Sequence, residues 1–324
     1  PVIIVAAGPS LRKNAKWLKE AKGHALIVAV SRAVLYLNEV NIVPDMIVDI
    51  DETNPYSTVS DKCKKVPILC NSCIGETTFY WNEGVKLLML DKPFVQGIKA
   101  KIGYPTIPYG YYGSCSIAAY AVFAMLGTKK IILVGQDLAV SEDGKSHAEG
   151  VHEDLEENEL LPGYYGGQVK SRSDWYGFWT WYQRNIPLYP STELINATEG
   201  GAAIPGTIQK PLKEVVDEIQ KNKLNMDFLQ DETYRVSVEE YDKMLYYLEE
   251  AKKEFREISA WTKKKYLESL DKLEKMTIYP LVEECMYVSD ERDEWKRFCE
   301  AVEFMKNHGW RNKNEFERCK RTIS

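Results

Sequence analysis

The stretch that decides the fold is the first one, residues 1–11, which read Pro1-Val2-Ile3-Ile4-Val5-Ala6-Ala7-Gly8-Pro9-Ser10-Leu11. The apolar run from Val2 to Val5 is followed at once by a Gly-Pro turn, which is typical of a strand buried on both faces in a parallel α/β sheet. Ser10 is a favourable N-cap, and the apolar spacing after it predicts a helix over residues 11–20. The chain therefore opens with a strand, a turn of small residues and a helix.

This opening unit directs backbone N–H groups and the positive end of a helix dipole toward the space above the sheet, where a phosphate is welcome. Gly8, Pro9 and Ser10 are therefore candidate nucleotide-binding residues. The alternative is an ordinary strand-to-helix turn, since many such turns contain glycine and bind nothing.

Composition limits the class of protein. The 324 residues are 44% hydrophobic and 28% charged, and the net charge of −6 argues against broad nucleic-acid binding. No run of about 18 apolar residues is present, so we expect no membrane span. The chain starts within a strand and without Met, a pattern typical of a fragment of a longer protein.

Seven scattered cysteines, an odd number, predict reduced thiols and a cytoplasmic location. The segment Cys70-Asn71-Ser72-Cys73 has the spacing of a zinc knuckle, but no second Cys/His pair follows at a suitable distance. We therefore expect ordinary buried cysteines there rather than zinc.

Two further βα units follow the first. Apolar runs over residues 25–30 and 46–50 predict strands, and residues 32–39 predict the helix between them, which together give a βαβαβ unit with a parallel sheet. Asp49 and Asp51 fall on one face at the carboxyl end of the third strand, where ligands bind in open α/β sheets. They are candidates for a divalent cation or sugar hydroxyls, and the alternative is a solvated acidic loop.

The middle of the chain repeats the pattern. Residues 66–70 and 85–90 predict short strands, and Gly113-Ser114 precede a long apolar helix over residues 115–126, which offers a second anion-binding point. The tyrosines just before it are either stacking partners for a base or half-buried loop aromatics. A further strand over residues 130–134 ends in Gly135-Gln136-Asp137.

The loop after that strand carries two of the four histidines, His147 and His152. A loop histidine titrates near neutral pH, which suits a general base. The alternative is a surface histidine without a role. We choose His147 as the candidate base, and Asp137, at the strand end on the same side, as the group that orients its ring.

A second glycine-bearing loop follows an aromatic helix predicted over residues 174–186. Residues 194–202, Leu-Ile-Asn-Ala-Thr-Glu-Gly-Gly-Ala, form a polar loop after a short strand, suited to close backbone approach to a ligand. Its candidate binding residues are Asn196, Thr198, Glu199, Gly200 and Gly201.

Beyond residue 210 the composition changes to charged helix. A capping box at Ser237 and an apolar stripe predict one helix to about Thr277, stopped by Pro280, and a second helix to about His308. We therefore predict a Rossmann-like α/β domain over residues 1–210 and a helical region over residues 211–324. The helices either pack on the sheet domain or form an acceptor or self-association surface.

Several of these motifs, in this order, resemble the central domain of the motility accessory factor (Maf) flagellin glycosyltransferases. The resemblance rests on Gly8-Pro9-Ser10-Leu11, Pro44-Asp45 with Asp49-Ile50-Asp51, Gly113-Ser114, residues 134–139, residues 145–148 and residues 195–202. The same motifs are similar in part to sialyltransferases that use a CMP-activated sugar and to archaeal pterin pyrophosphokinases, which are MptE-like. Where the Maf family usually has an Asp after the second strand, this chain has Ser31-Arg32.

The resemblance implies transfer of a nonulosonic acid of the pseudaminic or legionaminic type, from its CMP ester to Ser or Thr of flagellin. It implies no obligatory cofactor; Mg²⁺ or Mn²⁺ is the cation that Asp49 and Asp51 would take. The nucleotide and donor site would comprise Gly8, Pro9, Ser10, Asp51, Asn71, Ser72, Gly113, Ser114, Gly135, Gln136 and the five residues of the loop at 196–201. Two alternatives remain, a pterin pyrophosphokinase that uses Mg-ATP, and a flagellin-binding protein without catalysis.

Overall fold

The computed structural model describes residues 1–51, 55–71, 74–84, 86–88, 97–98, 100–101, 103, 113–149, 159–221, 223–225, 238–287 and 293–304. The chain divides into two compact units. Unit 1 comprises residues 1–70, 74–87 and 111–231, and unit 2 comprises residues 71–73, 88–110 and 232–324.

Unit 1 is built on one sheet with the strand order β10-β9-β6-β1-β2-β3-β4-β5. All neighbouring pairs from β10 to β4 are parallel, as the sequence predicts for an α/β fold. The strands are β1 (Val2–Val5), β2 (Leu26–Val30), β3 (Met46–Asp49), β4 (Ile68–Cys70), β5 (Lys86–Leu88), β6 (Lys130–Val134), β9 (Glu193–Asn196) and β10 (Ile208–Gln209).

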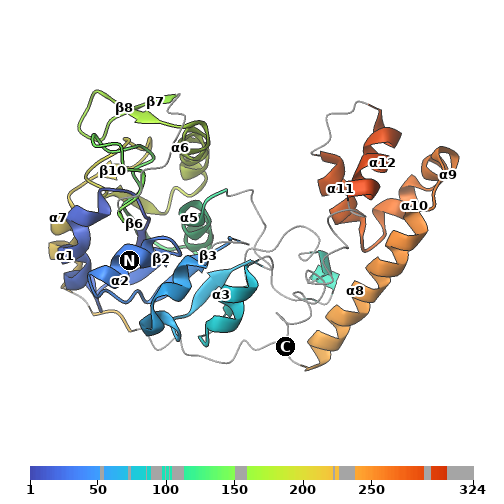
Figure 1. Ribbon diagram of the computed structural model, residues 1–324, viewed down its shortest axis with the longest axis horizontal. Helices are drawn as coiled ribbons and strands as arrows, with labels where there is room; N and C mark the ends of the chain where they lie inside the picture. The colour runs from blue at the N-terminus through green and yellow to red at the C-terminus, as the bar shows by residue number, and fades with distance from the viewer. Residues whose placement is uncertain are drawn as a thin grey trace. The chain divides into compact units, whose positions relative to one another are not determined.

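Helices cover both faces of this sheet. Figure 1 shows α1 and α7, which pack against each other, on one side of the strands and α5 on the other. Helix α5 is apolar all round and packs on β1, β2, β3 and β6, so it is buried and covers the centre of one face of the sheet. The elements that join the strands of unit 1 are α1 (Leu11–Ala21), α2 (Ala33–Glu39), η1 (Tyr56–Val59), η2 (Asp61–Cys63), α3 (Glu76–Trp81), α5 (Cys115–Met125), α6 (Ser173–Asn185), η3 (Ile186–Leu188) and α7 (Leu212–Ile219).

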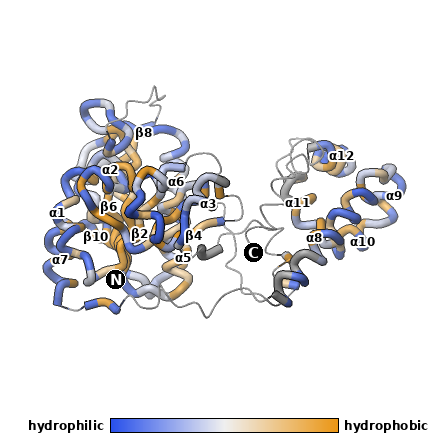
Figure 2. Tube along the Cα trace, turned by 60° about the horizontal axis from the view of Figure 1, so that its bottom comes forward, coloured by the Kyte–Doolittle hydropathy of each residue, from blue (hydrophilic) through white to orange (hydrophobic). Residues whose placement is uncertain are grey.

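The core of unit 1 follows directly from the apolar runs. Strands β1 and β2 are buried at every position, which is the expected result for parallel strands covered on both faces. Figure 2 shows hydrophobic residues gathered along the central strands, while much of α1 is hydrophilic. The predicted Rossmann-like fold class is therefore confirmed.

The structure contains one hairpin that the sequence does not predict. Strands β7 (Glu159–Pro162) and β8 (Gln168–Ser171) pair antiparallel, apart from the main sheet. Gly166 and Gly167 in the turn have φ of 90° and 67°, values that glycine adopts readily because it lacks a Cβ. The hairpin is tied to the loop after β9, since the N–H of Tyr164 donates to the carbonyl of Gly201 at 2.8 Å.

Unit 2 consists of helices, as the sequence predicts, but in shorter pieces. The predicted single helix to Thr277 is wrong: the structure has α8 (Val238–Ile258), α9 (Lys263–Glu268) and α10 (Leu270–Glu274). Thr262 starts α9, because its hydroxyl accepts the N–H of Lys265 at 3.3 Å. Pro280 does not stop a helix but lies in the first turn of α11 (Tyr279–Tyr287), where a missing N–H costs nothing. Helix α12 (Glu294–Phe304) follows.

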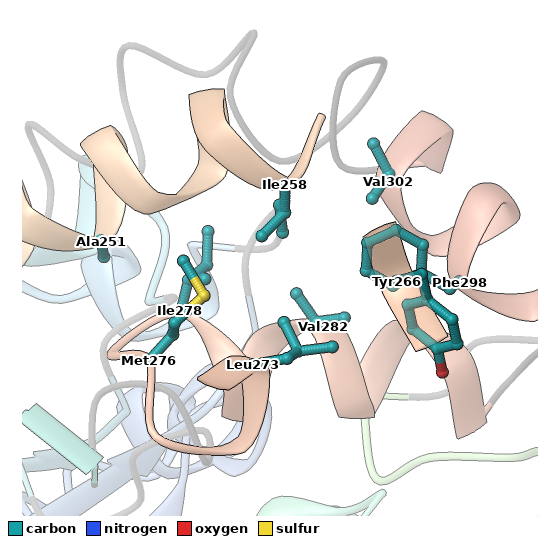
Figure 3. Close-up of a cluster of buried hydrophobic side chains, with 9 residues drawn as sticks. All are labelled: Ala251, Ile258, Tyr266, Leu273, Met276, Ile278, Val282, Phe298 and Val302. Atoms are coloured by element: carbon teal, nitrogen blue, oxygen red, sulfur yellow. The ribbon is translucent and has the colours of Figure 1, made fainter. Parts of the chain in front are cut away.

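The helices of unit 2 share a core of their own. Figure 3 shows nine buried side chains from α8 to α12, namely Ala251, Ile258, Tyr266, Leu273, Met276, Ile278, Val282, Phe298 and Val302. The ring centroids of Tyr266 and Phe298 are 4.7 Å apart, so aromatic packing holds α9 against α12. None of the described helices of the chain is long and apolar enough to cross a membrane.

Candidate active site

The predicted site residues gather where the strand order of the sheet reverses. Strand β1 lies between β2 and β6; the chain runs outward from β1 to β5 on one side and returns through β6 to β9 and β10 on the other. In such sheets ligands bind in the crevice outside the carboxyl ends of the strands at this switch point. Here these ends carry Gly8-Pro9-Ser10 after β1 and Gly135-Gln136-Asp137 after β6.

Asp137 occupies the N-terminus of α1. Its Oδ2 accepts the hydroxyl of Ser10 at 2.7 Å, and its two oxygens accept the backbone N–H of Ser10 at 3.2 and 3.3 Å. The Ser10 side chain therefore bonds to Asp137 and does not cap α1. The positive end of this helix, predicted to hold a phosphate, already faces a carboxylate of the chain itself.

Gly8 is required by contacts within the protein. A Cβ at this position would lie 2.0 Å from Asp137 Oδ2 and 2.5 Å from the carbonyl oxygen of Gly135, far inside contact distance. The N–H of Gly8 donates to that same carbonyl at 2.8 Å. Gly135 has φ of 68° and is equally crowded, since its Cβ would meet the carbonyl of Ala6 at 2.4 Å. Gly8 and Gly135, from which the sequence predicts close approach of a ligand, thus allow the chain after β1 to pack closely against the chain after β6.

The carboxyl group of Asp137 holds its proton more tightly than a surface aspartate. Burial raises its pKa to about 6, while the hydrogen bonds from Ser10 and the charge of Lys13 act in the opposite direction. The group is thus ionised at neutral pH, with a pKa that lies unusually close to neutrality.

The loop after β9 packs tightly on the loop after β6. A Cβ at Gly201 would lie 2.3 Å from the carbonyl oxygen of Asp137, and the hydroxyl of Thr198 accepts the N–H of Gln136 at 3.2 Å. Gly200 faces Ser10 and Asp137, its Cβ position lying 3.1 Å from the Ser10 Cβ. The structure therefore brings the predicted loop residues together with the β1 and β6 ends.

Glu199 has a structural partner. Its Oε1 accepts the N–H of Leu212 at 2.9 Å, at the start of α7, and its backbone has φ of 58°. The carbonyl of Glu199 accepts the Lys13 ammonium at 3.0 Å and the Tyr165 hydroxyl at 3.1 Å. This residue thus links the glycine loop to α1, α7 and the β7–β8 hairpin.

His147, the candidate base, lies in the irregular segment that follows β6. Its Nδ1 is 2.8 Å from the hydroxyl of Ser146, and its ring meets the ring of Trp175 edge to face at 6.4 Å. The side chain is partly exposed, as a base that meets a substrate must be. Ser146 is one partner of His147 Nδ1, both oxygens of Asp137 accept bonds from Ser10, and the orientation of the His147 ring by Asp137 stays a prediction.

Asp49 and Asp51 differ in their surroundings. Asp49 is fully buried, and its Oδ1 accepts the N–H of Asp51 at 3.1 Å. Burial raises the pKa of Asp49 to about 7, with a further contribution from the charge of Asp51, while the hydrogen bond from the Asp51 N–H acts in the opposite direction. Burial and the negative charge of Asp49 raise the pKa of the adjoining Cys115 thiol to about 12, so this cysteine is a protonated packing residue.

The N-terminus of α5 differs from that of α1. Ser114 is its N-cap, but the Ser114 hydroxyl contacts the hydroxyl of Ser116 at 2.9 Å and accepts no N–H of the helix. Gly113 precedes it with φ of 58°, against the ring of Phe178. The first N–H groups of α5 therefore lack a side-chain cap, which leaves them suited to an anion.

Three buried polar atoms at the carboxyl edge of the sheet have no hydrogen-bond partner among the described residues: Asp49 Oδ2, Gln136 Oε1 and Asn196 Nδ2. Unsatisfied buried polar groups are costly, so a native protein commonly satisfies them with water or a ligand. They come from the ends of β3, β6 and β9, which is the edge that the sequence predicts for the site.

Some predicted residues lie elsewhere. Asn71 follows β4 and is buried, whereas Ser72 and the competing His152 lie outside the described residues. Within the described part of the chain, no group of three His, Cys, Asp or Glu side chains could hold a metal. A cation on Asp49 and Asp51 therefore stays a prediction, as do the predicted roles in nucleotide binding.

Two arginines that the sequence does not single out belong to this region. Arg12 Nε donates to the carbonyl of Ala148, and Arg32 Nε pairs with Glu149 Oε1 at 2.8 Å. Both hold the His147 segment over the ends of β1 and β2. The one sequence signal for these contacts is position: Arg12 lies in the first turn of α1 and Arg32 just before α2, from where long side chains reach across the sheet edge.

Two comparisons with known proteins match the chain. Residues 1–143 match the family model of the 6-hydroxymethylpterin diphosphokinase MptE-like proteins. The solved structure of a Maf glycosyltransferase from Magnetospirillum magneticum AMB-1 has the same fold, with a TM-score of 0.55 at 15% sequence identity. That match covers 100% of this chain and 53% of the solved one, so the chain spans about half the length of that protein. No curated protein matches by sequence.

The fold thus defines an α/β protein whose parallel sheet has a switch point next to β1, the place where open sheets of this kind bind ligands. The family model confirms the predicted resemblance to the MptE-like proteins over residues 1–143. The solved structure confirms the predicted resemblance to the Maf proteins at the level of the fold.

Proposed function

We propose that the protein is a glycosyltransferase that moves a nonulosonic acid of the pseudaminic or legionaminic type from its CMP ester to a Ser or Thr hydroxyl of flagellin. The observation that carries the proposal is the fold shared with a Maf glycosyltransferase along the whole chain, unit 2 included. The switch point of the sheet, with a partly exposed histidine on the loop after β6, is compatible with this chemistry.

In this proposal the donor phosphate lies at the N-terminus of α5. The N-terminus of α1 already faces the Asp137 carboxylate, and a second anion there would be repelled. No described side chain caps the first turn of α5, which Gly113 and Ser114 precede, and a helix N-terminus favours negative charge. The carboxyl of Asp49 adjoins Cys115 at the start of this helix, but burial raises the pKa of Asp49 to about 7, so its negative charge near neutral pH is only partial. Stabilising the phosphate in this way makes CMP a better leaving group.

His147 would take the proton of the acceptor hydroxyl. As the bond from the sugar to CMP breaks, positive charge develops at the anomeric carbon, and the acceptor oxygen attacks this carbon. His147 holds the released proton, the role for which enzymes use the imidazole side chain most often. No cofactor is required by this scheme; Mg²⁺ or Mn²⁺ at Asp49 and Asp51 would be accessory.

The direct test is transfer itself. Incubation with a CMP-nonulosonate and flagellin should increase the mass of the flagellin by one sugar residue and release CMP. Absence of transfer, and of CMP release with every nonulosonate donor tried, would exclude the proposal.

A second function is favoured by one observation. The family model that matches residues 1–143 is that of the MptE-like proteins, named for a pterin diphosphokinase. A triphosphate donor needs a divalent cation, for which Asp49 and Asp51 are the candidates. Calorimetry separates the two functions: CMP should bind without metal under the first, and ATP should bind only with Mg²⁺ under the second.

A further inference from the structure

The segment that carries His147 is irregular, yet the sheet fixes it at several points. The N–H of Ala148 donates to the carbonyl of Ala7 at 2.8 Å, directly beyond β1. The carbonyl of Ala148 accepts Arg12 Nε. The next residue, Glu149, pairs with Arg32. The backbone on the carboxyl side of His147 is thus attached to β1, α1 and the start of α2.

The Arg32–Glu149 pair differs from most ion pairs of the chain. Its Nε and Oε1 atoms are 2.8 Å apart, and the two side chains are only 23% and 11% exposed. Surface pairs such as Lys213–Asp217, whose side chains are 55% and 52% exposed, contribute little because water screens them. A pair that is largely shielded from water constrains its two segments more strongly.

The Arg32 end of the pair is held by neighbouring elements. Arg32 is the residue just before α2, two positions beyond β2, and its guanidinium lies 5.3 Å from the centre of the Tyr56 ring. Glu149 is two residues beyond His147 and 117 positions from Arg32 in the sequence. Movement of Glu149 away from Arg32 would therefore move the His147 backbone relative to the sheet.

We propose that Arg32 and Glu149 are positioning residues, whose ion pair holds His147 in the place where it meets the acceptor hydroxyl. This inference rests on the proposed function, in which His147 is the base. The pair acts through the backbone of residues 147–149 and touches neither donor nor acceptor. Its physical basis is that a catalytic group displaced by about 1 Å loses on the order of 100-fold in rate.

Charge reversal tests the pair. Arg32→Glu and Glu149→Arg each place two like charges together, whereas the double variant restores an ion pair of opposite orientation. We expect each single variant to lower kcat for CMP release by about 10-fold or more with KM for the donor nearly unchanged, and the double variant to recover most of the loss. The reversed Lys64–Glu83 pair, whose side chains are 41% and 50% exposed, is the matched control and should leave kcat unchanged.

A second measurement does not depend on activity. In NMR spectra, the ring proton signals of His147 should be shifted by the ring current of Trp175. The signals that are missing from the spectrum of His147→Ala identify His147 among the four histidines. Both single reversals should abolish this shift and the double variant should restore it. Glu149→Gln, which keeps the size of the side chain, gives the same comparison if a reversal variant does not fold.

The outcomes are distinct. If the single variants keep both the ring-current shift and kcat, or if the double variant restores neither, the pair does not position His147. If the parent protein releases no CMP from any nonulosonate, the proposed function fails, while the NMR comparison still decides whether the pair fixes the histidine.

Discussion

The hydroxyl of Ser10 donates to Asp137 at 2.7 Å, across 127 residues of sequence, and this bond joins the turn after β1 to the end of β6. It lies at the switch point of the sheet, where the sequence predicts a phosphate. Because the carboxylate belongs to the chain itself, the α1 N-terminus faces negative charge without a ligand, whereas no described side chain caps the N-terminus of α5.

The first prediction concerns Asp137 and pH. Its pKa is about 6 in the folded state and 3.8 is its ordinary value, so the folded protein binds the proton more tightly. The contribution of this carboxyl to the free energy of unfolding is therefore largest below about pH 4 and is lost as pH rises through about 6, a change of about 3 kcal/mol. Asp137→Asn should flatten this part of the profile, measured by urea unfolding at pH 4.5 and 7. An unchanged slope would contradict the raised pKa.

The second prediction concerns Gly8. Even Gly8→Ala places a Cβ 2.0 Å from Asp137 and 2.5 Å from the Gly135 carbonyl, which the backbone must move to avoid. We expect a loss of about 1–3 kcal/mol or more, the usual cost of overpacking, with a lower melting temperature. Gly177→Ala is the control, because Gly177 in α6 has no positive φ and has open space around its Cβ position, so this variant should melt at or above the parent's temperature. A Gly8→Ala variant that melts with the parent would refute the packing role.

The third prediction concerns His147 as the base. His147→Ala should lower CMP release and transfer by about 100-fold or more, the usual scale for removal of a general base, while CMP binding stays nearly unchanged. Isothermal calorimetry and a transfer assay give the two quantities. His152→Ala is the comparison and should lose much less. Equal activity of His147→Ala and the parent would move the base to Asp49, Asp51 or Glu199.

The fourth prediction concerns Glu199. Its carboxylate accepts the N–H of Leu212 at the first turn of α7, so Glu199→Ala leaves that N–H without a partner. We expect a loss of about 1 kcal/mol, typical of a missing helix cap, and Glu199→Gln should retain most of the stability. Chemical denaturation of both variants is the measurement. Equal loss in the two variants would show that the charge matters and the hydrogen bond does not.

The buried strands could be predicted from the sequence because each is a short apolar run bounded by turn residues. Strand β1 begins at Val2 and ends at Val5, as predicted, and β6 has the predicted bounds Lys130 and Val134. The hairpin β7–β8 could not be predicted, because Glu159–Pro162 and Gln168–Ser171 lie mostly at the surface and lack a regular apolar alternation. The break in the predicted helix near Trp261 also gave no local signal beyond Thr262.

The candidate site was predictable in outline and not in its contacts. Carboxyl ends of parallel strands share one edge, so Gly8, Asp49 and Asp137 could be expected near one another. The sequence predicts an anion site at the N-terminus of α1 and another at that of α5. The carboxylate of Asp137 occupies the first of these through its long-range bond with Ser10, which no local pattern reveals. Likewise, the contact of Arg32 with Glu149 joins segments 117 residues apart.

The docking of the β7–β8 hairpin has a practical consequence for labelling the protein. Its base is fastened to the glycine loop, since Tyr164 donates to Gly201 and Ala203 donates to the carbonyl of Pro162, both at 2.8 Å. Gly166 and Gly167 have φ of 90° and 67°, so a side chain at either would strain the turn, whereas Gln168 at the start of β8 is an exposed position that does not require glycine. A fluorophore carried at Gln168 would sit on a hairpin bonded to the glycine loop, so that its emission reports on movement of that loop.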